Sequence, residues 1–451
     1  MSAQRLGLPE KNWTKENKMK IWLCTPYGTL PGEAFRETRY AMLGRALARR
    51  GHEVTWWTAN FCHYSKTFRS EETKDINVEP GFTIRLVPAP PYVRHVGFAR
   101  LRFEFLFALR FFRMAWRCDP PDSIVSGDAT MAWTQACLTL SRHFGADLVY
   151  DIIDLYPEVF TGVLPSWLRG LQKQVFWPLY ALRSRRLRKA SAVTAVCDDY
   201  LNPARLANPS LGSDRLLTVF WGTDLKEFRK AQGDAAQIAA LAGKLGKRAG
   251  DVFAIYAGTL GVLYDIDALL DAAKLLKGNP RLKILIAGSG PRAVDIREFA
   301  ARHDLNNLVI LGEVGFAELI RIYQVCDIGL CLYGVNSPVA MPIKVFDYLA
   351  AGLPVANSIG GFLERLLGER RIGVQYKAGD AESLAAVLDR LSCDDEMRRS
   401  MVENAKSAAR EFDSALQYGR FVDLLERLAK TRSAERRNEM VSDGELQVSR
   451  K

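Results

Sequence analysis

The chain has 451 residues, enough for two or three domains, and its 48% hydrophobic and 25% charged residues are ordinary for a globular protein. Its net charge of +11 favours an anionic partner: nucleic acid, a membrane surface or a phosphorylated substrate. The eight cysteines form no Cys-x-x-Cys pair, which argues against a zinc site or a disulfide framework and fits a reducing cytoplasm. No run of 18 uncharged apolar residues occurs, so no membrane-spanning segment is expected.

The first half of the chain begins with a βαβ pattern. Residues 1–18 are polar, and we expect a disordered tail rather than a signal peptide. A strand at 20–25, a helix at 34–50 and a strand at 53–58 predict one unit of a parallel sheet. Gly28 and Gly32 lie at the C-terminal end of the first strand, where open α/β sheets bind ligands; a plain turn is the alternative.

Two later segments mix cations with aromatic residues. Residues 94–117 carry arginines at helical spacing, and residues 167–189 have seven Lys or Arg and no acid. Basic aromatic helices of this kind lie among the headgroups of anionic membranes; core helices with solvated arginines are the alternative. Nucleic-acid binding is not expected, because no RNA- or DNA-binding motif accompanies the charge. The residues predicted to face a membrane are Arg110, Phe111, Phe112, Arg113, Arg117 and Trp177.

A carboxylate stands at the end of the strand predicted at 147–154. Asp154 could accept a hydrogen bond or a proton from an acceptor hydroxyl. Glu158, four residues on, could orient Asp154 or the acceptor. A helix N-cap is the alternative role for Asp154. Residues 229–250 change composition to Ala, Gly and Lys and are predicted to link two domains.

The second half contains glycine turns at strand ends. Gly258 and Gly261 follow a strand at 251–257, and paired glycines let backbone N–H groups approach a phosphate. The pair Asp265-x-Asp267 has the shape of a metal-binding motif, but we expect helix capping there and no metal site.

The stretch 337–358 is predicted to form a loop, a short helix and a strand. Lys344 and Asp347 are three residues apart and share a helix face. A cation and a carboxylate near a helix N-terminus suit a sugar nucleotide, with pyrophosphate at Lys344 and ribose at Asp347. A surface ion pair is the alternative.

This stretch resembles the nucleotide-binding segment of family 4 glycosyltransferases, whose pattern is approximately Pro-x-Lys-x-x-Glu-Tyr-x-Ala-x-Gly-x-Pro-Val. The matching residues are Pro342, Lys344, Tyr348, Ala350, Gly352, Pro354 and Val355. Further matches lie at 51–54, 256–265 and 288–291, and residues 151–158 resemble a subgroup that builds surface polysaccharides. The departures are Val339 in place of a glutamate, the shorter Asp347, Trp221 in place of an asparagine, and Val262 where relatives have a cation.

The resemblance covers about residues 19–430 and implies the α/β GT-B fold: two Rossmann-like, doubly wound domains facing across a cleft. The expected parts are a tail at 1–18, an acceptor-side domain at 19–228, a linker at 229–250, a nucleotide-sugar-binding domain at 251–409, a helix crossing back at 410–431 and a disordered tail at 432–451.

The implied activity is that of a retaining glycosyltransferase. Its partners would be a nucleotide-sugar donor, a lipid-linked glycan acceptor and the inner face of an anionic plasma membrane, in cell-envelope polysaccharide synthesis, and it would need no metal cofactor. The expected donor-binding residues are Gly258, Thr259, Gly261, Gly288, Gly290, Glu313, Val314, Lys344 and Asp347. The expected catalytic residues are Asp154, Lys344 and Asp347, with Gly28, Gly32 and Glu158 on the acceptor side. A nucleotide-sugar 2-epimerase and a non-catalytic partner subunit are the alternatives.

Overall fold

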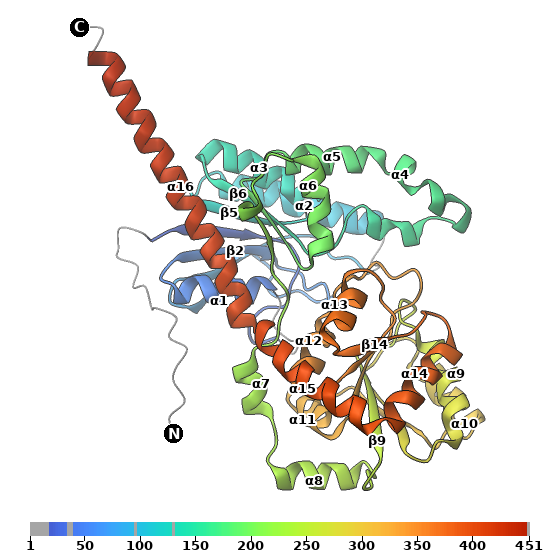
Figure 1. The fold of residues 1–451 in the computed structure, drawn as a ribbon. Helices are drawn as coiled ribbons and strands as arrows, with labels where there is room; N and C mark the ends of the chain where they lie inside the picture. The colour runs from blue at the N-terminus through green and yellow to red at the C-terminus, as the bar shows by residue number, and fades with distance from the viewer. Residues whose placement is uncertain (1–17, 34–38, 94–96, 129–130, 449–451) are drawn as a thin grey trace, which may run out of the picture.

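The computed structural model describes residues 18–33, 39–93, 97–128 and 131–448, and it contains two sheets that lie in separate halves of the chain (Figure 1). The predicted N-terminal tail therefore lies outside the described residues, apart from Lys18.

The first sheet has eight strands in the order β3-β4-β2-β1-β5-β6-β7-β8, and all pair in parallel except the edge strand β3. Its central strands are short apolar runs buried on both faces, as a sheet covered by helices on both sides requires. The strands are β1 (Lys20–Cys24), β2 (Glu53–Ala59), β3 (Lys74–Glu79), β4 (Phe82–Val87), β5 (Ser123–Gly127), β6 (Asp147–Ile152), β7 (Ala192–Ala195) and β8 (Leu216–Thr218).

Helices cover both faces of this sheet. The helices α1 and α16 share one core cluster with it, and α2 and α3 share the other. The helices in this half are α1 (Arg39–Arg49), α2 (Phe98–Ala115), α3 (Ala132–Phe144), α4 (Gln172–Val175), α5 (Trp177–Leu187) and α6 (Asn202–Ala207).

The second sheet has six strands, all parallel, in the order β11-β10-β9-β12-β13-β14. The strands are β9 (Val252–Ala257), β10 (Leu282–Ala287), β11 (Leu308–Gly312), β12 (Ile328–Cys331), β13 (Val355–Asn357) and β14 (Gly373–Gln375). The helices are α9 (Ile266–Leu275), α10 (Ala293–Arg302), α11 (Phe316–Val325), α12 (Ile343–Ala350), α13 (Phe362–Arg370), α14 (Ala381–Cys393) and α15 (Asp395–Glu411). The expected pair of doubly wound domains is thereby confirmed.

Two chain segments join the domains. The predicted linker is largely helical: α7 (Leu225–Ala231) and α8 (Ala235–Lys244) pack against α11. The second segment returns from α15 into α16 (Ser414–Val448), and there the backbone N–H of Thr223 donates to the Phe412 carbonyl at 3.1 Å. Gly222 has φ 65°, and a Cβ there would lie 2.6 Å from that same carbonyl, so glycine is needed where the two segments meet.

The crossing helix is longer than expected. The sequence predicted a disordered tail from residue 432, whereas α16 continues to Val448 and its distal part extends away from the first domain (Figure 1).

Both sheets change winding direction at their first strand. β1 lies between β2 and β5, and β9 lies between β10 and β12, so loops leave in opposite directions at the C-terminal ends of β1 and β9. Such switch points leave a crevice for ligands.

Candidate functional site

Two glycine loops pack against each other at the switch point of the second sheet. Gly258, after β9, and Gly288, after β10, have φ 147° and 149°, values that favour glycine. A Cβ at Gly288 would lie 1.9 Å from the Gly258 carbonyl oxygen, and a Cβ at Gly290 would lie 2.4 Å from that of Leu260. These glycines therefore allow two backbones to touch beside the cavity described next.

The loops border a cavity of about 240 Å³. Its lining includes five residues that the sequence assigned to the donor: Gly258, Thr259, Gly288, Glu313 and Val314. The loops that follow β9, β10 and β11 thus converge on one recess at the C-terminal ends of three adjacent strands.

Lys344, in the first turn of α12, extends toward these loops. A Cβ added at Gly258 would lie 2.9 Å from its Nζ. Nζ also lies 4.2, 5.0 and 5.3 Å from the ring centroids of Tyr256, Tyr264 and Tyr333. Among the described residues Nζ is buried and has no hydrogen-bond partner. Burial lowers the pKa of Lys344 to about 8, because the ammonium has lost its hydration. An anionic ligand would supply the missing partner.

Asp347 has a different environment from Lys344. It is buried, and its Oδ1 accepts a hydrogen bond from the Thr223 hydroxyl at 2.6 Å. Thr223 belongs to the segment that joins the domains, so this carboxylate ties α12 to the connection. The expected ribose contact of Asp347 stays a prediction.

Asp265 occupies the N-cap position of α9, as expected, but its side chain makes no capping hydrogen bond. Asp265 Oδ2 accepts from the Tyr376 hydroxyl at 3.0 Å and from the Gly379 N–H at 2.8 Å. Asp267 forms an ion pair with Arg292 at 2.6 Å. Within the ranges that the structure describes, no group of three His, Cys, Asp or Glu side chains could hold a metal ion.

On the first domain, Asp154 lies next to a second carboxylate that the sequence analysis missed. Asp128 follows β5 as Asp154 follows β6, and Asp128 Oδ1 accepts from the N–H groups of Ile153 and Asp154 at 3.2 and 3.3 Å. The Asp154 side chain is accessible to water. The protein groups packed around it nevertheless limit the hydration of its carboxylate, and this raises the pKa of Asp154. Burial and the nearby Asp154 charge raise the pKa of Asp128, and the backbone N–H groups of Asp154 and Ile153 oppose that rise.

The other acceptor-side residues have structural partners. Glu158 forms a two-pronged ion pair with Arg183, at 2.7 and 3.1 Å, so it does not orient Asp154 as the sequence suggested. The Gly28 carbonyl accepts from Arg69 at 2.7 Å, and Gly32 lines a groove beside the same arginine. These glycines shape the loop after β1.

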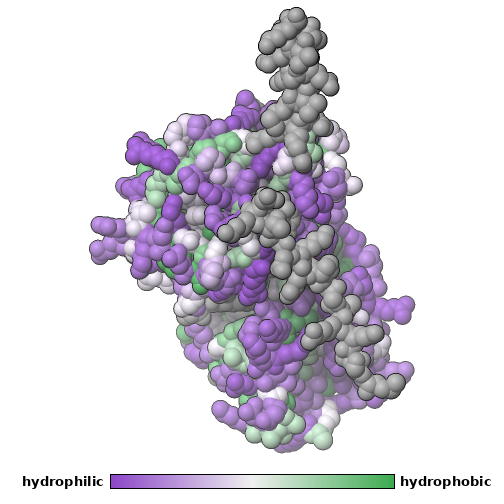
Figure 2. Space-filling view, turned by 90° about the vertical axis from the view of Figure 1, so that its left-hand side faces the viewer, coloured by the Kyte–Doolittle hydropathy of each residue, from purple (hydrophilic) through white to green (hydrophobic). Residues whose placement is uncertain are grey.

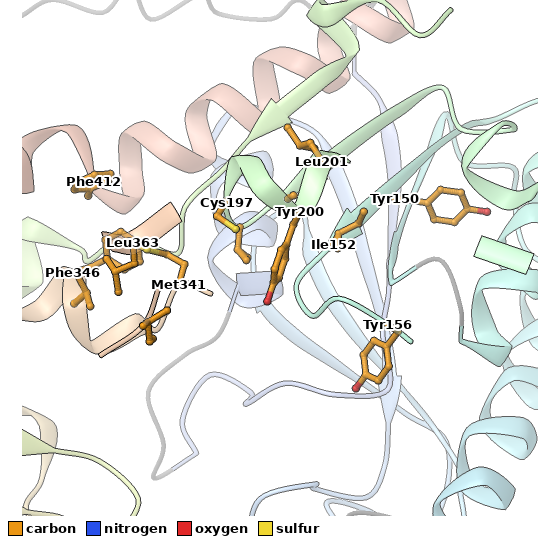
Figure 3. Close-up of a cluster of buried hydrophobic side chains, with 14 of the residues drawn as sticks. Tyr150, Ile152, Tyr156, Cys197, Tyr200, Leu201, Met341, Phe346, Leu363 and Phe412 are labelled. Carbon is orange, nitrogen blue, oxygen red and sulfur yellow. The ribbon is translucent and has the colours of Figure 1, made fainter. Parts of the chain in front are cut away.

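Tyr200 connects the surroundings of Asp154 to the second domain. Burial is the main cause that raises the pKa of Tyr200, and the charge of Asp154 is the second. The Tyr200 hydroxyl donates to the Pro338 carbonyl, just before α12, at 3.0 Å. One buried cluster spans both halves (Figure 3). Figure 3 shows Ile152, Cys197 and Tyr200 on one side of it and Met341, Phe346, Leu363 and Phe412 on the other.

The predicted membrane-facing residues have mixed positions. Phe111 is fully buried against the ring of Trp57, at 5.3 Å between centroids, so its assignment to a membrane surface was wrong. It belongs to the stripe of α2 that packs on the sheet. Phe112 is partly buried beside Trp116, whereas Trp177 is 65% exposed. The arginines Arg110, Arg113 and Arg117 are exposed.

Most of the large apolar side chains that are exposed in these segments are others than those predicted. In α2 they are Phe98 (91% exposed), Leu101 (58%) and Phe105 (61%), and near α4 and α5 they are Trp167 (75%), Leu171, Val175 and Trp177. The ring contacts Tyr156–Phe160 and Phe160–Phe176, at 5.2 and 6.0 Å, connect the Asp154 region to this second group. Figure 2 shows a face on which hydrophilic residues predominate and hydrophobic ones form small separate groups. In the described part of the chain, no helix has the length and apolar character needed to cross a bilayer.

Comparisons with known proteins agree with this arrangement. The model "Glycosyl transferase 4-like domain" matches residues 37–210, and "Glycosyl transferases group 1" matches residues 237–408. The alpha-monoglucosyldiacylglycerol synthase of Streptococcus pneumoniae is 24% identical over 38% of this chain and 38% of its own length. The amylovoran biosynthesis glycosyltransferase AmsK of Erwinia amylovora is 29% identical over 36% of this chain and 41% of its own.

The chain thus spans less than half the length of the curated relatives it matches. Among solved structures, Anabaena HepE in complex with UDP has a TM-score of 0.63 and 15% identity, covering 92% of this chain and all of its own.

Proposed function

Because the chain belongs to the GT-B glycosyltransferases that resemble family 4, we propose that it transfers a sugar from a nucleotide-sugar donor to a lipid-linked glycan acceptor, with retention of configuration. The main support for this proposal is the buried ammonium of Lys344. It lies close to Gly258 and has no hydrogen-bond partner among the residues that the structure describes. An anionic ligand would pair with this ammonium.

Lys344 would stabilise the negative charge that develops on the nucleoside diphosphate as the sugar leaves it. The cavity beside the paired glycine loops would receive the nucleotide, and Lys344 Nζ lies close to Gly258, one of the residues that line that cavity. Fixed positive groups stabilise a leaving group without having to reorganise during the reaction. They supply this field without a metal, so we expect activity to persist in EDTA.

Asp154 would hold the attacking hydroxyl of the acceptor. Asp128 Oδ1 already accepts two backbone N–H groups, whereas Asp154 is accessible to water, so Asp154 is the better placed of the two carboxyl groups to accept a hydrogen bond from an acceptor. The link from Asp154 through Tyr200 to Pro338 supports a position that faces the donor half.

The exposed aromatic side chains support an acceptor carried by a lipid at the cytoplasmic face of a membrane. Trp167 and Trp177 project from a segment that has exposed cations and, from 159 to 197, no acid. Amphipathic surfaces of this composition bind anionic bilayers, with about 1 kcal/mol from each cation near the surface. The likeness to a glycolipid synthase and an amylovoran biosynthesis enzyme supports a role in envelope glycoconjugate assembly.

The test is a thermal-shift panel of UDP, GDP and ADP in EDTA, followed by an assay of nucleotide release. A nucleotide that binds only the folded protein raises its melting temperature. We expect one nucleotide to do so, and its sugar conjugate to be consumed when membrane lipid extract is added. Lys274→Met, which changes an exposed lysine on α9, should behave as wild type. If none of the nucleotides raises the melting temperature, the proposed donor site is contradicted.

A further inference from the structure

A second unpartnered lysine lies on the first domain, in the loop that follows β2. The loop is closed by hydrogen bonds from Cys62 N to Thr67 O at 2.8 Å and from Lys66 N to Cys62 O at 3.0 Å. Lys66 has φ 58°, a backbone conformation that residues other than glycine rarely adopt. The turn directs its ammonium inward, where Nζ lies 4.4 Å from the ring centroid of Tyr92.

Although the stem of Lys66 is half-buried, its Nζ is fully buried and has no hydrogen-bond partner within the described ranges. Burial, together with the nearby positive charge of Arg100, lowers its pKa. A buried ammonium without a partner costs free energy, and a second cation close by adds to that cost. Such a pair is stabilised when an anion lies between its members.

The carboxylate of Glu104, which lies beside this pair, is already engaged. Glu104 Oε1 accepts from the Tyr27 hydroxyl at 2.5 Å and from Arg100 Nε at 3.0 Å. Asp154 is a second carboxylate near Arg100, whose charge opposes the rise in the pKa of Asp154 that burial causes. No ion pair joins Lys66 to a carboxylate among the residues that the structure describes.

Arg100 lies close enough to Asp154 for the two charges to interact. Burial raises the pKa values of Asp154 and Tyr156, and the charge of Arg100 opposes both rises. Burial and then the charge of Asp154 raise the pKa of Tyr64, two residues before Lys66. An anion at Lys66 and Arg100 would therefore lie on the acceptor side of the site.

The outer face of α2 suits a lipid attached to that anion. Phe98, Leu101 and Phe105 are spaced i, i+3 and i+7, so they form one apolar stripe, and all three are exposed. Arg100 and Glu104 lie beside this stripe around the same helix, and both contact the Tyr27 hydroxyl. A charged headgroup and an apolar chain thus have adjacent places on the first two turns of one helix.

We propose that Lys66 and Arg100 bind a phosphate group carried by a lipid, with the lipid chain along Phe98, Leu101 and Phe105. This inference rests on the proposed function, whose acceptor it makes a lipid phosphate or diphosphate. The same phosphate chemistry occurs in membrane phospholipid headgroups, and the experiment separates the two sources.

The first measurement is calorimetric titration of the full chain with inorganic pyrophosphate while UDP, or the nucleotide found by the panel, saturates the donor site. Wild type should bind pyrophosphate. Lys66→Met should weaken that binding about tenfold or more, as expected for one lost hydrogen bond between charged groups. Lys66→Arg should restore it, and Lys274→Met should match wild type. Retained nucleotide binding shows that Lys66→Met is folded.

The second measurement is flotation with phosphatidylcholine vesicles that contain either a polyprenyl phosphate or phosphatidylglycerol. Loss of binding by Lys66→Met on polyprenyl phosphate alone supports an acceptor phosphate, and equal loss on both vesicles supports a phospholipid headgroup. If nucleotide binding is intact but wild type does not bind pyrophosphate, or Lys66→Met binds it as wild type does, the proposed phosphate site is wrong. Failure of wild type to bind any nucleotide contradicts the proposed function instead.

Discussion

Replacing Lys344 by methionine should stabilise the unliganded protein and weaken its binding of the donor nucleotide. Burial lowers the pKa of this lysine from 10.5 to about 8, a difference that corresponds to about 3 kcal/mol against the charged form. Methionine keeps the apolar stem and removes the charge, and no hydrogen bond is lost within the described residues. We therefore expect a gain of about 1–3 kcal/mol in the free energy of unfolding at pH 7.

Binding should change in the opposite direction. A hydrogen bond between charged groups contributes about 1.5–3 kcal/mol, so losing the Lys344–diphosphate contact should weaken nucleotide affinity roughly 10- to 100-fold. Chemical denaturation measures the first effect and calorimetry the second. Lys274→Met should alter neither.

The same lysine predicts a pH dependence with a definite sign. The unfolded chain keeps the Lys344 proton up to about pH 10.5, whereas the folded protein releases it near pH 8. Unfolding therefore takes up a proton between these pH values. As pH rises through this window, the free energy of unfolding of wild type should increase relative to that of Lys344→Met. Nucleotide affinity should fall over the same range. A methionine variant that is less stable than wild type, or that binds the nucleotide equally well, would refute the reasoning.

Other substitutions test the remaining parts of the site. Gly288→Ala should destabilise the protein by about 2–4 kcal/mol and abolish nucleotide binding, because its Cβ would overlap a carbonyl; Gly261→Ala, whose Cβ would meet nothing closer than 3.7 Å, should be tolerated in both assays. Asp154→Asn should lower the turnover of acceptor while nucleotide affinity stays within about twofold in calorimetry, and a parallel loss of affinity would argue against its acceptor role. Phe105→Ser should reduce vesicle flotation without affecting the melting temperature, whereas Phe111→Ala should lower stability by about 3–5 kcal/mol, since only the second side chain is buried.

Local patterns in the sequence were sufficient for many of the strands, the glycine loops and the short helix that carries Lys344, but they did not predict β3, β4 or β14. Each depends on residues a few positions apart, because a strand, a turn or one helical turn constrains only neighbours. The position of Gly352 shows this well: it has φ 76° just after α12, as expected for the residue that ends a helix.

The partners of charged side chains were decided by the tertiary structure. Asp347 is bound by Thr223, 124 positions away, and Glu158 by Arg183, 25 positions away. A carboxylate lowers its free energy with whichever donor packing brings near, and that choice depends on how the two domains meet. Asp128 was missed for the same reason, although its place directly after a buried strand was a signal available in the sequence.

The exposed aromatic surface shows the same division within one helix. The sequence determined that residues 98–115 are aromatic, basic and helical. Because aromatic side chains occur nearly all around α2, periodicity did not determine which of them face water. Packing against Trp57 of the first sheet buries Phe111 and leaves Phe98 exposed. A helix with two apolar faces buries the one that fits its neighbours, and those neighbours come together only in the folded chain.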